Sequence, residues 1–123
     1  METVRVLVVD DQEPFRLAGA AVVEATDGFE LVGVADTGEA SVELARELRP
    51  DLVLMDVNLP GMSGTQATRA LRRLEPAPVV FLLSTYDRGE CDDETQECGA
   101  SAYITKSRVE SDLLRRTWDT VRR

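Results

Sequence analysis

The 123-residue sequence contains no histidine, and this absence removes several kinds of chemistry. It excludes histidine-ligated metal sites, Ser-His and Cys-His catalysis, and any phosphohistidine formed on this chain. Cysteine is scarce as well: Cys91 and Cys98 are too few for a disulfide framework, so we expect both to be reduced and to serve packing. Long apolar runs are also missing, since none approaches the ~18 residues of a membrane span. Because residues 1–5 have no signal-peptide layout, we expect a cytoplasmic protein without membrane contact.

Positive charge is in short supply. The chain has 14 lysines and arginines against 23 aspartates and glutamates, a net charge of -9. Nucleic-acid binding requires a basic footprint, so we do not expect this chain to bind nucleic acid by itself. The excess of acids suits a cation site or a basic protein surface better. The length predicts a single domain over residues 1–123.

Strand and helix patterns alternate along the whole chain. β-branched and apolar runs predict strands over residues 4–9, 31–35, 52–56, 79–83 and 102–104. Apolar spacing and capping residues predict a helix after each strand, at residues 14–25, 38–48, 63–74, 88–98 and 107–121. The first has its apolar residues at helical spacing from Phe15 to Ala25, and capping boxes are predicted at Ser63/Gln66 and Ser107/Glu110. The short connections favour right-handed crossovers and a parallel sheet, and therefore the α/β class.

The predicted strands end in polar groups that can do chemistry. The apolar run of residues 52–55 leads directly into Asp56, and the first, fourth and fifth strands lead into Asp10-Asp11, Ser84 and Lys106, so that four of the five strands end in this way. Parallel strands bring these ends to one edge of the sheet, where open α/β folds bind ligands. Three carboxylates repel one another unless a cation lies among them, and oxygen-only ligands suit Mg²⁺. A free carboxylate can attack phosphorus, while the hydroxyl and the ammonium hold phosphoryl oxygens.

Four motifs together indicate a family. They are the pair Asp10-Asp11, residues 55–64 around Asp56, the pair Ser84-Thr85, and residues 99–103 leading to Lys106. With these motifs the chain resembles, over its whole length, the receiver domain of two-component response regulators, and residues 55–64 look most like the LuxR/NarL type. The resemblance implies a flavodoxin-like (βα)5 three-layer sandwich with a parallel five-stranded sheet of order 2-1-3-4-5.

The resemblance also implies a phosphoacceptor and a metal site. Asp56 would accept a phosphoryl group from the phosphohistidine of a sensor histidine kinase. Asp11, Asp56 and the backbone carbonyl of Asn58 would ligate Mg²⁺ directly, and Asp10 would act through a water. A domain of this kind catalyses its own phosphorylation and dephosphorylation, and is not an enzyme acting on an external substrate.

Four further positions take roles by the same resemblance. Ser84 would hydrogen-bond the attached phosphoryl group, Lys106 would pair with it, and Thr85 would line the access to the acceptor. Tyr103 would be the aromatic that changes position on activation. The expected output is homodimerisation on phosphorylation and transcription regulation. DNA contact would run only through a C-terminal helix-turn-helix domain that this chain lacks.

The chain departs from the family pattern at two places. Ser107 follows Lys106 where proline is usual, so a cis bond is not expected there and the loop holding Lys106 would sit differently. The predicted helix over residues 88–98 is unusually polar, and we expect it to be short, shifted or mobile.

Other interpretations stay open. Taken singly, each acid could be a helix cap or a turn residue, and Lys106 could be solvated. An aspartyl-phosphate phosphatase of the haloacid-dehalogenase type would place a second acid where Asn58 stands. A flavin carrier of the same fold would have a Gly/Ser/Thr-rich loop in place of Asp10-Asp11. A stand-alone receiver that signals by protein–protein interaction without phosphorylation is the third alternative.

Overall fold

The computed structural model describes residues 3–84 and 98–121. Its strands are β1 (Val4–Val9), β2 (Phe29–Ala35), β3 (Leu52–Asp56), β4 (Val79–Ser84) and β5 (Ala102–Thr105). Its helices are α1 (Glu13–Ala25), α2 (Gly38–Leu48), α3 (Gly64–Leu71), α5 (Ser111–Val121) and a 3-10 turn, η2 (Lys106–Arg108). All strand pairs are parallel and the sheet order is β2-β1-β3-β4-β5, which confirms the predicted flavodoxin-like order. Thr85, Cys91 and all but the last residue of the predicted helix over residues 88–98 lie outside the described residues.

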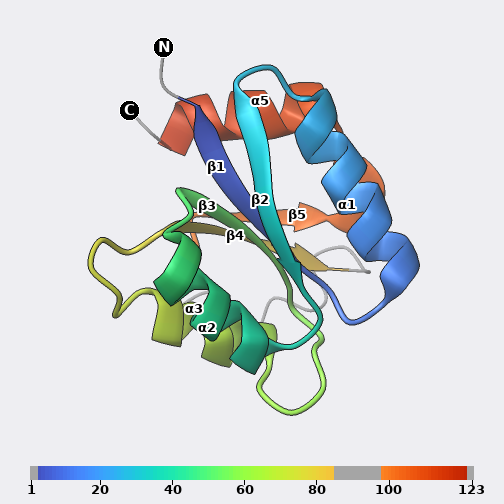
Figure 1. Cartoon of the computed structure of the whole chain (residues 1–123). Helices are drawn as coiled ribbons and strands as arrows, with labels where there is room; N and C mark the ends of the chain where they lie inside the picture. The colour runs from blue at the N-terminus through green and yellow to red at the C-terminus, as the bar shows by residue number, and fades with distance from the viewer. Residues whose placement is uncertain (1–2, 85–97, 122–123) are drawn as a thin grey trace.

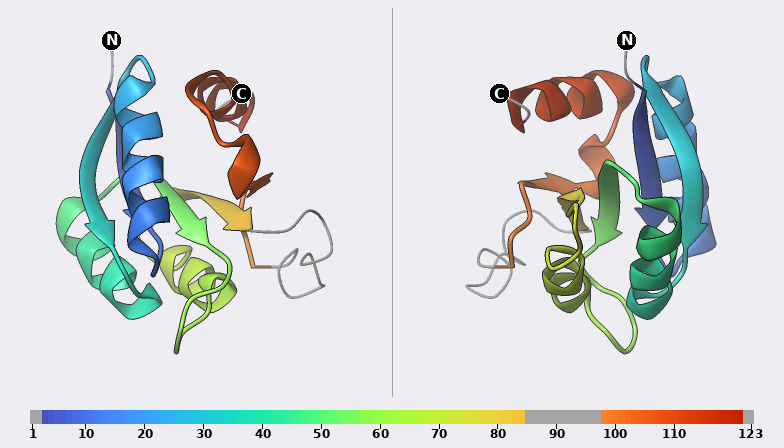
Figure 2. Two further views of the ribbon diagram at one scale, coloured as in Figure 1. Left: turned by 90° about the vertical axis from the view of Figure 1, so that its right-hand side faces the viewer. Right: turned by 60° about the vertical axis from the view of Figure 1, so that its left-hand side comes forward.

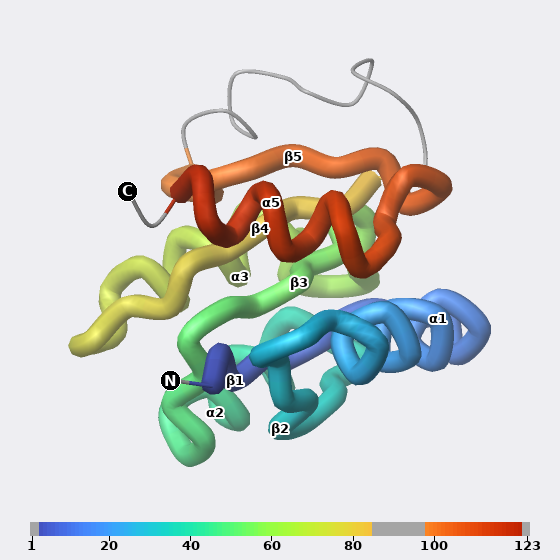
Figure 3. Tube along the Cα trace, turned by 90° about the horizontal axis from the view of Figure 1, so that it is seen from above, coloured from blue at the N-terminus to red at the C-terminus, as the bar shows by residue number. Residues whose placement is uncertain are grey.

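The sheet lies between two layers of helices, as the predicted sandwich requires. In Figure 1, α1 and α5 cover one face and α2 and α3 the other, and Figure 2 shows the same layers from two further sides. Seen from above, α1 and α5 both lie on the near side of the strands (Figure 3). Alternation along β1 assigns side chains to the two faces: Val6 and Val8 pack toward α1 and α5, and Leu7 and Val9 toward α2 and α3.

The central strand β3 is buried along its whole length. Leu52, Val53, Leu54 and Met55 have no exposed surface, which agrees with a continuous apolar run in a sheet covered on both faces. Cys98 is buried in the cluster between the sheet and α2 and α3, which agrees with its predicted packing role. No helix in the part of the chain that the structure describes is long and apolar enough to cross a membrane.

The start of α3 is held against the end of β3. Ser63 and Gln66 form the predicted capping box, with the Gln66 N–H donating to Ser63 Oγ at 3.2 Å and the Ser63 N–H to Gln66 Oε1 at 2.9 Å. A Cβ on Gly64 would collide with the backbone carbonyl oxygen of Asp56, so the close approach requires glycine. The loop after Asp56 is therefore anchored at both ends.

The segment after β5 differs from the prediction. Ser107 does not cap α5, because Lys106–Arg108 form a 3-10 turn closed by the Val109 N–H on the Lys106 carbonyl at 3.3 Å. The helix begins at Ser111 instead, and Glu110 accepts the Leu113 N–H at 3.1 Å. The cis peptide bond found among residues 3–84 and 98–121 is Glu75–Pro76, so the Lys106–Ser107 bond is trans, as its serine predicts.

Candidate functional site

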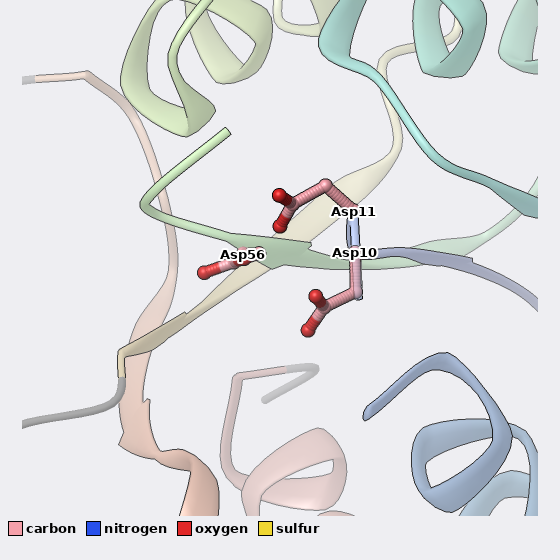
Figure 4. A group of neighbouring side chains, drawn as sticks. All are labelled: Asp10, Asp11 and Asp56. Carbon is pink, nitrogen blue, oxygen red and sulfur yellow. The ribbon is translucent and has the colours of Figure 1, made fainter. Parts of the chain in front are cut away.

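Three carboxylates meet at the carboxyl ends of β1 and β3. The two strands are neighbours, with Val9 opposite Met55, so Asp10 and Asp56 follow at the same edge. One carboxylate oxygen from each of Asp10, Asp11 and Asp56 lies within 4.8 Å of the others. Figure 4 shows Asp10 and Asp11 leaving the end of β1 toward the side on which Asp56 lies. Asp10 and Asp56 are buried, whereas Asp11 is exposed.

Backbone groups fix the direction of the two buried carboxylates. The Gln12 N–H donates to Asp10 Oδ1 at 3.0 Å, and the Asn58 N–H donates to Asp56 Oδ1 at 3.1 Å. Both are local turns in which an aspartate accepts from the backbone two residues ahead. The Arg16 guanidinium also donates to the Asp10 carbonyl at 2.9 Å, which holds the loop itself. Each carboxylate therefore turns its Oδ2 atom to another partner.

That partner is Lys106, at the start of η2. Its Nζ lies 2.7 Å from Asp10 Oδ2 and 3.3 Å from Asp56 Oδ2, and its side chain is only 8% exposed. The same ammonium lies over the ring of Phe15, 4.1 Å from the ring centroid. One ammonium thus faces two buried carboxylates with a third close by, so the cluster keeps an excess of negative charge.

The pKa of Asp56 is raised by its burial and by the excess negative charge around it. Burial, and next the neighbouring charge of Asp10, raise the pKa of Asp56 to about 6, against the lowering effects of Lys106 and the Asn58 N–H. The group that would stabilise ionised Asp56 is a further cation. An all-oxygen donor set with an exposed member, Asp11, fits a hard divalent ion such as Mg²⁺, which keeps part of its water shell.

Of the remaining predicted residues, Ser84 is placed beside the Lys106 segment by strand register. Ser84 is the last residue of β4 and pairs with Thr105, directly before Lys106. Asn58 is exposed, two residues beyond Asp56, and Tyr103 on β5 is 39% exposed. Thr85 lies outside the described residues, so its prediction has no structural counterpart. The functional roles of these four residues stay predictions.

Sequence reasoning missed two residues that contact the site. The apolar spacing of α1 assigns Phe15 to the buried face of the helix, but its side chain is 40% exposed and contacts Lys106. Arg16 carried no signal at all, because a side chain that reaches a backbone carbonyl leaves no mark in residue spacing. For Phe15, an aromatic one turn beyond an acid pair was the available signal.

Comparison with known proteins gives a consistent family. The model of the response regulator receiver domain matches residues 6–117. The response regulator GacA of Pseudomonas viridiflava is 42% identical over 103 residues, covering 84% of this chain and 48% of GacA. The transcriptional regulatory protein YdfI of Bacillus subtilis is 35% identical over 115 residues, covering 94% of this chain and 53% of YdfI.

Solved structures agree in fold. The signal receiver domain of NarL from Mycobacterium tuberculosis superimposes with a TM-score of 0.88 at 30% identity, covering 99% of this chain and 98% of that one. The chain spans about half the length of the curated regulators GacA and YdfI. With three clustered acids, a lysine against two of them and a family match over residues 6–117, this chain belongs to the response regulator receiver domain family.

Proposed function

We propose that this chain is a phosphorylation-controlled switch in which Asp56 accepts a phosphoryl group from the phosphohistidine of a sensor histidine kinase. The proposal is supported by the groups that surround the Asp56 carboxylate. Its carboxylate is buried at the edge of the sheet, within 4.8 Å of two other acids, and has the Lys106 ammonium 3.3 Å from its Oδ2. A carboxylate that could attack phosphorus, oxygen donors that suit a cation and an ammonium that could pair with phosphoryl oxygens lie together, which supports the proposal.

The transfer itself needs little from the protein beyond positioning. An oxygen of Asp56 attacks phosphorus, the new P–O bond forms as the P–N bond of the donor breaks, and the electron pair of that bond returns to the donor imidazole. Asp11, Asp56 and the carbonyl of Asn58 would hold Mg²⁺, with Asp10 acting through a water. That ion would neutralise the charge that collects on the phosphoryl oxygens.

The remaining residues act on the product. Lys106 starts from a position between Asp10 and Asp56 and would pair with a phosphoryl oxygen after the transfer. Ser84, at the end of the neighbouring strand, would donate its hydroxyl hydrogen to another. Tyr103, exposed on β5, would change position as Ser84 and Lys106 are drawn in. Thr85 would line the access to the acceptor.

The output of the switch belongs to a larger protein or a partner. YdfI is named a transcriptional regulatory protein, and both GacA and YdfI are about twice as long as this chain, which supports transcription regulation through a further domain. That domain would bind DNA, and the receiver would form a homodimer on phosphorylation, as the family resemblance implies. The net charge of -9 supports leaving DNA contact to that domain. A methylesterase of Alkalilimnicola ehrlichii is also 41% identical over 104 residues, which covers 27% of its length, so receivers of this kind serve different outputs. The site of action would be the cytoplasm.

The first test is the intact mass of the protein after incubation with acetyl phosphate and Mg²⁺. We expect wild type to gain one phosphoryl group, Asp56→Asn to gain none, and EDTA to block the gain. A gain that persists in Asp56→Asn would move the acceptor elsewhere, and wild type that gains none would favour signalling without phosphorylation. Steady turnover of a phosphate ester would favour the phosphatase alternative.

A further inference from the structure

Phe15 lies in the first turn of α1, at the edge of the sheet where the acids meet. Its side chain is 40% exposed, although the apolar spacing of the helix places it with Val22 on the buried face. The ring faces the charged end of Lys106, with Nζ 4.1 Å from the ring centroid. At this distance the negative face of an aromatic ring attracts a cation. The ring is therefore engaged with the charged centre of the site.

The contact matters because of what Lys106 is. A lysine has a flexible four-carbon stem and loses much rotamer freedom when its ammonium is held in one place. Two carboxylates share this ammonium, with Asp10 Oδ2 at 2.7 Å and Asp56 Oδ2 at 3.3 Å. The Phe15 ring adds a third, uncharged contact, and the Lys106 side chain is left only 8% exposed. The ring thus narrows the positions that the ammonium can take.

The ring borders an open pocket and is not part of the packed core. A pocket of about 60 Å³ lies beside it, between Ala18 and Val22 of α1, Leu83 of β4 and Val109 beyond η2. The pocket is open to solvent, and Asp10 and Lys106 also line it, so it belongs to the same edge of the sheet. Phe15 lines the pocket without filling it, and its ring lies over the ammonium instead.

We propose that Phe15 is a positioning residue for phosphoryl transfer, with its ring face holding the Lys106 ammonium beside Asp56 Oδ2. The proposal rests on the proposed function, since it concerns the rate of transfer to the same carboxylate. Phe15 makes no contact with the phosphoryl group in this scheme and acts only through Lys106. An ammonium that is held close to the acceptor has only a short way to move, so it costs less reorganisation when the phosphoryl oxygens arrive.

The test compares aromatic side chains of similar shape whose ring faces differ in negative potential, together with leucine, which has no ring. Phosphorylation of Asp56 by acetyl phosphate with Mg²⁺ is timed for wild type, Phe15→Tyr, Phe15→Leu, and 3,4,5-trifluorophenylalanine at position 15. We expect the phosphorylation rate of Phe15→Tyr to stay within about twofold of the wild-type rate. Phe15→Leu and the trifluorinated ring should each lower the rate roughly fivefold. Leu17→Ala, a change at a 62% exposed residue of the same helix, serves as the matched control and should leave the rate unchanged.

Two further measurements separate positioning from a structural role. In a Lys106→Met background, Phe15→Leu should slow the residual transfer no further, because the ring acts through the ammonium. In ¹⁵N-lysine-labelled protein, the ammonium protons of Lys106 should show an upfield ring-current shift in wild type and Phe15→Tyr, and lose it in Phe15→Leu.

Each failure is distinguishable. Wild type that takes up no phosphoryl group on Asp56 overturns the proposed function and this role with it. Leu and trifluorophenylalanine variants as fast as wild type overturn the role of Phe15 alone. A Phe15→Leu effect that persists in the Lys106→Met background, or an unshifted ammonium signal in wild type, also overturns it.

Discussion

The ammonium of Lys106 lies closer to Asp10 than to Asp56. Its Nζ is 2.7 Å from Asp10 Oδ2 and 3.3 Å from Asp56 Oδ2. Among the described residues of this cluster Lys106 supplies the only ammonium, and its contact with Asp56, the proposed acceptor, is the longer of the two. This agrees with the pKa of Asp56, which burial and the charge of Asp10 raise although Lys106 lowers it. Phosphorylation would draw the lysine from Asp10 toward the phosphoryl oxygens.

Removal of the ammonium should destabilise the metal-free protein. Lys106→Met keeps much of the stem but leaves the buried Asp10 and Asp56 carboxylates without it, and breaking a buried pair in this way costs about 3 kcal/mol. We expect this loss in urea unfolding at pH 7.5 with EDTA, and partial recovery with Mg²⁺, since a ligand of the folded state stabilises it. Arg46→Met is the matched control: its pair with Glu43 is exposed and should matter by less than about 0.5 kcal/mol. Equal effects of the two substitutions would contradict the buried pair.

Asp56→Asn should stabilise the metal-free protein, and the gain should depend on pH. The pKa of Asp56 is about 6 in the folded protein and 3.8 for an ordinary aspartate, so the folded state holds this proton more tightly. Ionised Asp56 therefore lowers stability progressively as pH rises from about 4 through 6. Asparagine carries no such charge, so its advantage over wild type should be about 2 kcal/mol larger at pH 7.5 than at pH 4. Urea unfolding in EDTA at both pH values measures it, and an advantage that is constant with pH would contradict the raised pKa.

Mg²⁺ binding should weaken in acid for the same reason. A proton and the metal compete for Asp56, so below a pKa of about 6 the fraction of protein ready to bind falls. Between pH 7 and pH 5 we expect the apparent Kd to rise roughly tenfold, measured by calorimetry. Asp11→Asn should weaken binding at both pH values, whereas Glu47→Gln, at an exposed position on α2, should change neither. An affinity that is flat from pH 7 to pH 5 would contradict either the raised pKa of Asp56 or its role as a ligand, and Asp56→Asn separates the two.

The acid cluster could be predicted because it depends on the backbone. The carboxyl ends of parallel strands share an edge, so Asp10-Asp11 and Asp56 had to meet once β1 and β3 were neighbours. The alternation of β1 and the apolar run of β3 likewise depend only on residue types and the strand period. That strand order came from the family resemblance, since the strand pattern alone allows several orders.

The side-chain partners could not be predicted in this way. Lys106 lies closer to Asp10 than to Asp56, and its position depends on the 3-10 turn that follows β5. The Ser107/Glu110 spacing had predicted a capping box at this turn. Phe15 was assigned to the core because helical spacing cannot tell an apolar contact from a contact with a cation. Both depend on the three-dimensional path of a loop, which local periodicity does not contain.

The close contact between Gly64 and the end of β3 should make this glycine irreplaceable. An added Cβ would meet the Asp56 carbonyl oxygen and lie 2.8 Å from the Val57 Cα, both backbone atoms that cannot turn aside. Gly64→Ala should therefore destabilise the protein by about 3 kcal/mol and slow phosphorylation, because relief of the clash displaces Asp56 itself. Gly19→Ala is the matched control: its Cβ would meet only a Val8 methyl group at 3.1 Å, and alanine favours the helix. Thermal unfolding and the acetyl phosphate assay test both variants. If Gly64→Ala were as stable and as fast as Gly19→Ala, the anchoring of α3 would not position the acceptor.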